Sequence, residues 1–342
     1  MGKSKILLCF LLTQVGFAQI KSIDSTATEH NLKITSVDSI RNKQLYNSID
    51  SHFVYQYEKP RFFQMFQYIP DDLYKFGLFT IQKENLKWDA LTVGSTLAIL
   101  PFDQKLTDNA GEIGHKIGGW DLDSQYGKVF GLFSIVPKNI SSAVYYIGNG
   151  GTTLLLSGAF YGIGKFCHND YRALNTSNEL VEALFSVGIL DQSIKRITGR
   201  QSPNRAIADG TSGGEWVPFP SFNSYQKQTP NYDAMPSGHL ATYMATLTII
   251  TVNYPELKWI KPVGYAVGGV LAFNMVSSKV HWVSDYPLGI LMGYVIGKNI
   301  ADRRIKKIAK NNVGVNEVKK YKINYSMNQM NGYNVVGALI TF

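Results

Sequence analysis

The sequence predicts an all-α fold: a bundle of about six helices with a polar N-terminal arm and a small C-terminal β-hairpin. Two observations carry this prediction. Apolar residues recur in long helical runs between positions 69 and 310, and few charged residues interrupt them. By contrast, residues 320–342 alternate weakly around Asn331-Gly332, a dipeptide typical of a tight hairpin turn.

The N-terminus has the pattern of a secretory signal. Lys3 and Lys5 precede an apolar run, and Gly16-Phe17-Ala18 supplies small residues before a cleavage point. We therefore assign residues 1–18 to a signal peptide, with an uncleaved anchor as the alternative. Residues 19–68 are mostly polar and are expected to form an arm or linker.

Residues 69–310 form the expected helical domain. Trp88–Leu100 is an apolar helical run, and the glycines of Gly111–Gly119 predict a loop. Ser141–Gly164 carries no charge, so it is compatible either with a membrane span or with close packing in a helical core. Soluble and membrane-integral bundles therefore both stay open.

The second half of this domain combines a long loop with further helices. Residues 202–235 are rich in Pro, Gly, Ser and aromatic residues, and long loops in compact domains often carry function. The helical runs around this loop are Glu179–Lys195, Ser237–Val252, Val263–Ser277 and Asp285–Lys298. The basic residues that follow indicate either an ordinary helix C-terminus or a cytoplasmic anchor.

The overall charge restricts the class of partner. The chain has a formal charge of +9, which favours anionic partners such as phosphate esters or lipid headgroups. The basic residues do not alternate with aromatic residues along one face, so no nucleic acid partner is expected. No metal-ligand cluster is visible in the sequence, and we predict neither a metal nor another cofactor.

Pro236-Ser237-Gly238-His239 stands directly before an apolar helix. Serine is a good capping residue, and free backbone N–H groups at a helix N-terminus attract phosphate. Glycine lets a ligand approach the backbone closely, and the histidine can give a proton to a leaving oxygen. A capped helix whose histidine merely packs is the alternative interpretation.

A second histidine segment is His281-Trp282-Val283-Ser284-Asp285. His281 and Asp285 are separated by about one helical turn, so the carboxylate can accept a hydrogen bond from one ring nitrogen. That bond would leave the other nitrogen free to attack. A surface pair without chemistry has the same spacing.

A basic turn follows the helix that ends at Lys195, and it contains Arg196, Arg200 and Arg205. Fixed cations can neutralise the oxygens of a transferring phosphoryl group, although such turns are also common on solvated surfaces. The basic turn and both histidine segments lie at ends of predicted helices. If those helices pack side by side, the ends converge on one pocket.

These segments resemble the type-2 phosphatidic acid phosphatase and vanadium haloperoxidase superfamily. Its pattern is Lys-x6-Arg-Pro, then Pro-Ser-Gly-His, then Ser-Arg-x5-His-x3-Asp, and residues 140–300 follow it in order. The resemblance implies that Lys195, Ser237 and Gly238 bind phosphate. It further implies that His281 is the nucleophile, Asp285 its orienting partner and His239 the general acid.

The sequence departs from the pattern at both arginines. Ser202 and Met275 occupy their positions, and neither side chain can form a bidentate clamp on phosphate. Arg200, Arg205 and Lys279 are nearby in the sequence and are the candidates to supply the missing charge.

We therefore expect a phosphomonoesterase of the cell envelope that acts through a phosphohistidine, on a lipid phosphate or diphosphate or another small phosphomonoester. The protein would face the periplasm, either as a soluble bundle or within the inner membrane. The aromatic side chains of the long loop would shield an acyl chain or pack on their own domain: Trp216, Phe219, Phe222 and Tyr225. The alternatives are a noncatalytic phosphate-binding or scaffolding protein and a vanadate-dependent haloperoxidase.

Overall fold

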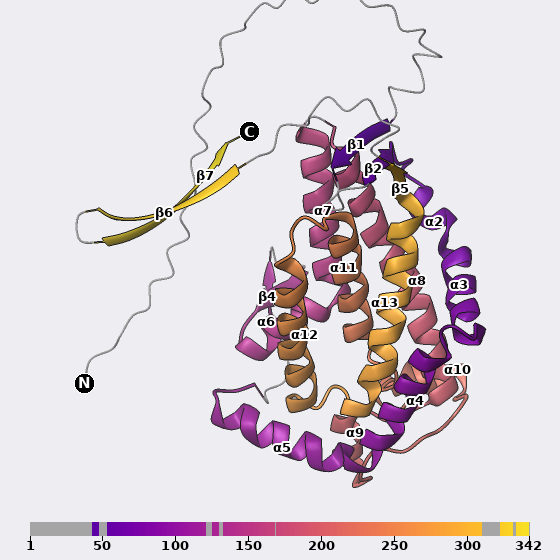
Figure 1. The fold of residues 1–342 in the computed structure, drawn as a ribbon. Coiled ribbons are helices and arrows are strands. Elements are labelled where there is room, and N and C mark those ends of the chain that lie inside the picture. The colour runs from indigo at the N-terminus through magenta and orange to yellow at the C-terminus, as the bar shows by residue number, and fades with distance from the viewer. Residues whose placement is uncertain are drawn as a thin grey trace, which may run out of the picture. The chain divides into compact units, whose positions relative to one another are not determined.

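The computed structural model describes residues 43–47, 53–120, 125–129, 133–167, 169–309, 322–330 and 333–341. The signal peptide predicted for residues 1–18 lies outside this part of the chain. The described residues are mainly helical and their sheets are small and antiparallel, which confirms the predicted fold class (Figure 1).

Three long helices form the centre of the bundle: α8 (Tyr171–Thr198), α11 (Gly238–Asn253) and α13 (Tyr286–Arg304). Each of these helices packs against the other two. The helices around them are α3 (Ile69–Ile81), α4 (Leu86–Ile99), α5 (Asp103–Lys116), α6 (Ile140–Gly148), α7 (Gly150–Phe166) and α12 (Ile260–Ser277). The short helices are α2 (Gln64–Gln67), α9 (Pro203–Asp209), α10 (Phe222–Lys227), η1 (Leu100–Phe102), η2 (Thr229–Asn231) and η3 (Val283–Asp285).

Glycines spaced four residues apart allow α13 to approach α11 closely. A Cβ atom at Gly289 would lie 2.6 Å from the Ser237 carbonyl oxygen, and one at Gly297 would lie 2.7 Å from that of Ala245. Gly293, between them, faces the Ala241 carbonyl at similarly close range. Because residues four apart share one helix face, this stripe brings the two backbones together along about two turns.

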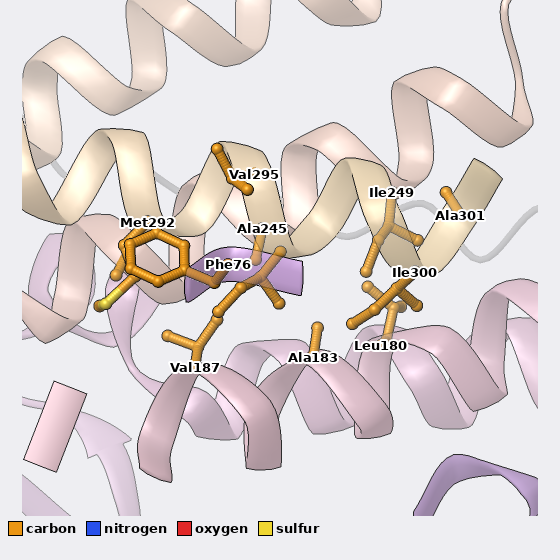
Figure 2. Packing of buried hydrophobic residues seen from close by; sticks show 12 residues of the cluster. Phe76, Leu180, Ala183, Val187, Ala245, Ile249, Met292, Val295, Ile300 and Ala301 are labelled. Carbon is orange, nitrogen blue, oxygen red and sulfur yellow. The ribbon is translucent and has the colours of Figure 1, made fainter. Parts of the chain in front are cut away.

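The main core fills the space between the central helices. Leu180, Ala183 and Val187 from α8 meet side chains of α11 and α13, and Phe76 joins them from α3 (Figure 2). All of these side chains are buried. Their burial against one another supplies the apolar stabilisation that holds the central helices in register.

Part of the predicted polar arm forms a sheet. β1 (Lys43–Asn47) pairs with β2 (Phe53–Glu58), and β2 pairs with β5 (Lys306–Ala309). Tyr57 is fully buried and its hydroxyl lies 2.9 Å from the Asn253 side-chain oxygen, which ties this sheet to α11. The polar composition did not predict these strands, because their contacts come from residues about 250 positions away.

Two further strand pairs complete the secondary structure. β3 (Tyr126–Val129) pairs with β4 (Phe133–Pro137). β6 (Lys322–Met330) pairs antiparallel with β7 (Tyr333–Thr341), with Met330 opposite Tyr333. The C-terminal hairpin predicted around Asn331-Gly332 is therefore confirmed.

Two local predictions differ from the structure. Gly111 and Gly114, predicted to lie in a loop, are part of α5, which continues to Lys116. The uncharged stretch Ser141–Gly164 is divided into α6 and α7 at Asn149, whose side chain accepts a hydrogen bond from the Gly151 amide and caps α7. Among the described residues, none of the helices has both the length and the apolar character that a membrane crossing requires.

The basic end of α13 faces inward. Arg303 Nη1 lies 2.6 Å from Glu182 Oε1, and Arg304 also pairs with the Glu182 carboxylate. Glu182 and the neighbouring Asp72 are fully buried. These two arginines thus lie in the last turn of α13, as an ordinary helix C-terminus would have them, and they pair with buried carboxylates.

Candidate active site

The ends of α8 and α11 meet at one pocket, and His281, which precedes α13, lies beside it, 3.4 Å from His239. Lys195 comes from the last turn of α8, His239 from the first turn of α11, and His281 from the segment that leads through η3 into α13. The pocket has a volume of about 240 Å³, and Asp191, Lys195, Gly238 and His239 are among its lining residues.

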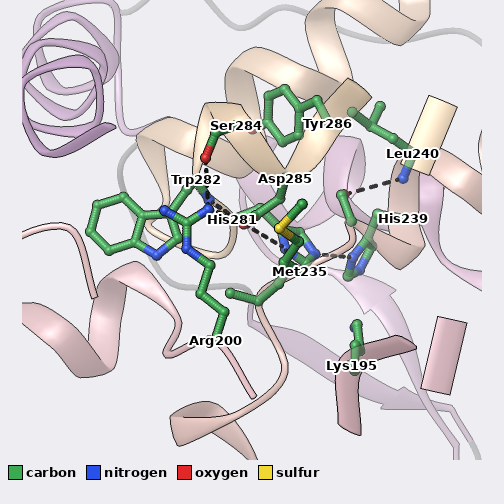
Figure 3. Close-up of polar contacts among 12 residues, drawn as sticks. Lys195, Arg200, Met235, His239, Leu240, His281, Trp282, Ser284, Asp285 and Tyr286 are labelled. Atoms are coloured by element: carbon green, nitrogen blue, oxygen red, sulfur yellow. Dashed lines mark hydrogen bonds and ion pairs between the residues drawn. The ribbon is translucent and has the colours of Figure 1, made fainter. Parts of the chain in front are cut away.

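His281 is held by the backbone of the long loop. Its ring is 3% exposed, and Nδ1 lies 2.8 Å from the Ala234 carbonyl oxygen. Since a carbonyl can only accept, Nδ1 must carry a proton, and in the neutral ring Nε2 is then left with its lone pair. Nε2 faces His239 Nδ1 at 3.4 Å (Figure 3). The tautomer therefore leaves the nitrogen nearer to His239 free to act as a nucleophile.

Asp285 lies close to His281 without being its hydrogen-bond partner. Its Oδ2 atom is 3.7 Å from His281 Nδ1 and instead accepts a hydrogen bond of 2.8 Å from the Trp282 amide. The hydrogen bond that the sequence assigned to Asp285 is thus made by Ala234. Asp285 fixes the turn on which His281 stands, so it acts on the ring through the backbone and through its charge.

Arg200 holds Asp285 from the other side. Its Nη1 atom lies 2.5 Å from Asp285 Oδ1 (Figure 3). Its Nη2 atom lies 2.6 Å from Asp103 Oδ2. All three side chains are fully buried. Ser284 joins the same cluster, because its amide donates to Asp103 Oδ1 at 3.0 Å. Both ends of the Arg200 guanidinium are occupied by carboxylates, so this residue is not placed to bind phosphate in this structure.

His239, in the first turn of α11, packs against an aromatic ring. The centroid of Tyr145, from α6, lies 4.4 Å from the His239 ring in an edge-on arrangement. Burial lowers the pKa of His239 well below its usual value, and the nearby His281 and Lys195 add to that effect. His239 is therefore neutral at neutral pH in this structure.

Two acidic side chains act on Lys195. Its Nζ atom lies 3.3 Å from Asp191 Oδ2. Burial alone would lower the pKa of Lys195, but the charges of Asp191 and Asp233 outweigh it and the net shift is upward. For Asp191 and Asp233, burial raises the pKa and the positive charge of Lys195 partly opposes the shift. Lys195 therefore keeps its positive charge in the buried pocket.

The two phosphate-binding candidates at the start of α11 differ in their availability. The Ser237 hydroxyl faces the Leu240 amide at 3.5 Å as the helix cap, and the Ser237 amide donates to the Asp285 carbonyl at 3.1 Å. Gly238, in contrast, lines the pocket without a side chain. Ser237 therefore shapes the helix end, while Gly238 presents no side chain to the pocket.

The remaining predicted cations are not brought to the histidines. Arg205 lies on α9, is about half exposed, and pairs with Asp209 at 2.9 Å. The Lys279 side chain makes no hydrogen bond or ion pair with any described residue, and its backbone has a left-handed φ of 60°. Of the cations proposed from the sequence, Lys195 is the one that lines the pocket described above.

The two residues that stand in place of the family arginines have structural roles. Met275 is fully buried in an apolar cluster with Leu240 and Leu271, and Ser202 is buried at the start of α9. An arginine is therefore replaced at one position by a core side chain, and at the other by a small polar one.

Sequence reasoning missed three residues of this site. Asp191 precedes Lys195 by four positions, and that spacing on a helix was a usable signal. Asp233 and Asp103 carried no such signal, because their contacts with the site depend on the tertiary fold.

The comparisons with known proteins agree with the geometry. The family model described as the PAP2 superfamily matches residues 177–304, which contain Lys195, His239, His281 and Asp285. The search of curated proteins returned no match, and neither did the search of solved structures. The match begins within α8 and continues through α11 to the end of α13. Residues 177–304 of this chain thus form a PAP2 superfamily domain.

Proposed function

We propose that this protein hydrolyses phosphomonoesters through a phosphohistidine on His281. Membership of the PAP2 superfamily supports a phosphatase-type function in general. The observation that carries the specific proposal is the hydrogen bond from His281 Nδ1 to the Ala234 carbonyl, which leaves Nε2 unprotonated beside His239.

In the first step, His281 Nε2 attacks phosphorus in line with the leaving oxygen. An N–P bond forms while the P–O bond to the leaving group breaks, and protonated His239 gives its proton to that oxygen. Lys195 supplies positive charge beside the transferring group. Because an incoming phosphate ester is an anion, it favours the protonated form of His239 that this step requires.

In the second step, water attacks the phosphohistidine and inorganic phosphate leaves. Neutral His239 accepts a proton from that water, and Nε2 of His281 regains its lone pair. The Ala234 carbonyl holds the ring throughout, and Asp285 stabilises the positive charge that His281 carries while it is phosphorylated. Arg200 holds Asp285 in place.

We further propose that the substrate is a lipid phosphate or diphosphate and that the protein works in the cell envelope. The signal sequence motivates the location. Phe219 and Phe222, on the long loop, are each 74% exposed, whereas Tyr225 is buried and the Trp216 ring stacks over Arg200. Two exposed phenylalanines on one loop suit contact with an acyl or prenyl chain.

Activity of the purified mature protein on an aryl phosphate and on phosphatidate tests this proposal. His281→Ala should abolish turnover of both substrates, and the exposed His115→Ala variant should retain it. Turnover in His281→Ala equal to that of the unaltered protein would exclude the phosphohistidine route. A preference for the aryl phosphate that persists when phosphatidate is dispersed in detergent would exclude the lipid substrate.

A noncatalytic phosphate-binding protein is the second candidate. The burial of Met275 in the core and the engagement of Arg200 by two carboxylates favour it, because both reduce the positive charge available to a transition state. Binding of inorganic phosphate with no turnover of either substrate would support this candidate.

A further inference from the structure

One of the residues that line the pocket, Asp191, is itself acidic. Asp191 lies one helical turn before Lys195 on α8, is 5% exposed, and directs its Oδ2 atom to Lys195 Nζ at 3.3 Å. Its Oδ1 atom is buried and has no hydrogen-bond partner. A buried carboxylate oxygen without a donor is costly, so the site leaves this acceptor available to a ligand.

The same carboxylate lies against the N-terminus of α11. A Cβ atom built on Gly238 would be 2.9 Å from Asp191 Oδ2 and 3.2 Å from Oδ1. Helix N-termini favour negative charge, and Lys195 adds a full positive charge. These are the two groups that the family pattern assigns to phosphate. Asp191 therefore occupies the anion-binding position with an internal carboxylate.

We propose that Asp191 is a proton-controlled occupant of the anion pocket: its charged carboxylate holds Lys195 and opposes a phosphate ester, and its protonated form hydrogen-bonds to the ester. This inference rests on the proposed phosphate site and names a residue that determines when that site binds. The hydrogen bond from protonated Asp191 to the ester takes over part of the phosphate binding that the two family arginines, replaced here by Ser202 and Met275, would provide.

The groups around Asp191 make its protonation accessible. Lys195 on α8 and His281 favour the charged carboxylate, while Asp233, on the loop before α11, disfavours it. His239 from α11 faces the same pocket, Tyr145 packs on His239, and Tyr225 from α10 lies close enough to interact with Lys195 and Asp191. Burial is the largest effect and raises the pKa of Asp191.

Sulfate binding to the purified protein tests the proposal, because sulfate, unlike phosphate, keeps a constant charge between about pH 5 and pH 8. Asp191→Asn preserves the shape of the side chain and carries an N–H donor at every pH. At about pH 8 we expect Asp191→Asn to bind sulfate about tenfold more tightly than the unaltered protein, and this ratio should fall as the pH is lowered. Taking the ratio at each pH removes the contribution of the histidines, which both proteins share.

Asp302→Asn is the matched control, because Asp302 forms an exposed pair with Lys298 at the same helical spacing. Its sulfate affinity should follow that of the unaltered protein at both pH values. An Asp191→Asn affinity that is equal to or weaker than that of the unaltered protein at about pH 8 would overturn the proposal, as would a ratio that does not change with pH.

Turnover and sulfate binding of the same variants distinguish a failure of this inference from a failure of the proposed function. If the predicted sulfate ratios are found but no variant turns over an aryl phosphate, Asp191 controls an anion site that is not catalytic. If turnover depends on His281 but the sulfate ratio is flat, the catalytic proposal stands and the role of Asp191 is wrong.

Discussion

The Arg200 guanidinium forms an ion pair with Asp285, with 2.5 Å between Nη1 and Oδ1, although the sequence suggested that Arg200 would bind phosphate. A second carboxylate, Asp103, pairs with the other Nη atom. The arginine thus connects α5 to the turn that carries His281, and its charge is used to hold the site rather than to bind a ligand.

Arg200→Ala is expected to destabilise the protein by about 3–5 kcal/mol, because it leaves two buried carboxylates without their cation. Arg200→Lys should recover little, since a single ammonium cannot make both contacts. Urea unfolding measures the loss. Arg205→Ala, which removes an exposed ion pair, should cost less than about 1 kcal/mol. Equal losses at the two positions would contradict this account.

Gly289→Ala is expected to reduce stability and turnover together. Its Cβ would lie 2.6 Å from the Ser237 carbonyl oxygen and would push the start of α11, with His239, away from His281. We expect a loss of about 1–3 kcal/mol. Gly269 in α12 has no atom within 4 Å of an added Cβ, so Gly269→Ala should stabilise the protein slightly. Thermal unfolding and aryl phosphate turnover of both variants check this contrast, and unchanged turnover in Gly289→Ala would argue against it.

Substrates with different leaving groups test the role of His239 as general acid. His239→Ala should reduce turnover of an alkyl phosphate by about 100-fold or more, because its poor leaving oxygen needs a proton. An aryl phosphate with an acidic phenol needs less assistance and should lose much less. Because the pKa of His239 is lowered, turnover of the alkyl substrate should also fall as the pH rises. Equal losses on both substrates would remove His239 from the protonation step.

The buried carboxyl of Glu179, which lies away from the active site, is expected to make the stability of the protein depend on pH. Burial raises its pKa to about 8, whereas the unfolded chain releases this proton near 4.5. Between those values the folded state holds more protons than the unfolded state, so stability falls as the pH rises through this range. Glu179→Gln removes that loss while keeping an acceptor for Asn253, which donates to the Glu179 carboxylate at 2.5 Å.

Glu179→Gln should therefore be more stable than the unaltered protein at about pH 8 and nearly equal to it at about pH 5, as measured by urea unfolding. Glu112→Gln, on the exposed face of α5, is the control and should change stability little at either pH. A gain in Glu179→Gln that is the same at both pH values would show that the carboxyl does not titrate in this range.

The sequence predicted the central helices and their convergence because both follow from local patterns. Apolar runs with a helical period identify α8, α11, α12 and α13, and Pro236-Ser237-Gly238-His239 marks the start of α11. The position of each candidate residue at a helix end then predicts a shared pocket. The contact between His239 and His281 bears out that convergence.

The errors concern tertiary contacts that no local pattern carries. A glycine is read as a loop residue, yet Gly111 lies within α5, which supplies Asp103 to the site. A histidine and an aspartate one turn apart are expected to bond, yet Ala234 takes that bond because the long loop passes beside the ring. The partner of Arg200 comes from about 100 residues earlier, and sequence spacing cannot reveal it.

Chemical trapping of the phosphorylated protein tests the central claim most directly. The protein is mixed with a phosphatase substrate, quenched in alkali, where phosphohistidine survives, and analysed by peptide mass spectrometry. The account predicts one phosphorylated peptide, with the phosphoryl group on His281, and no such peptide in His281→Ala. Turnover by the unaltered protein without any phosphorylated His281 would contradict it.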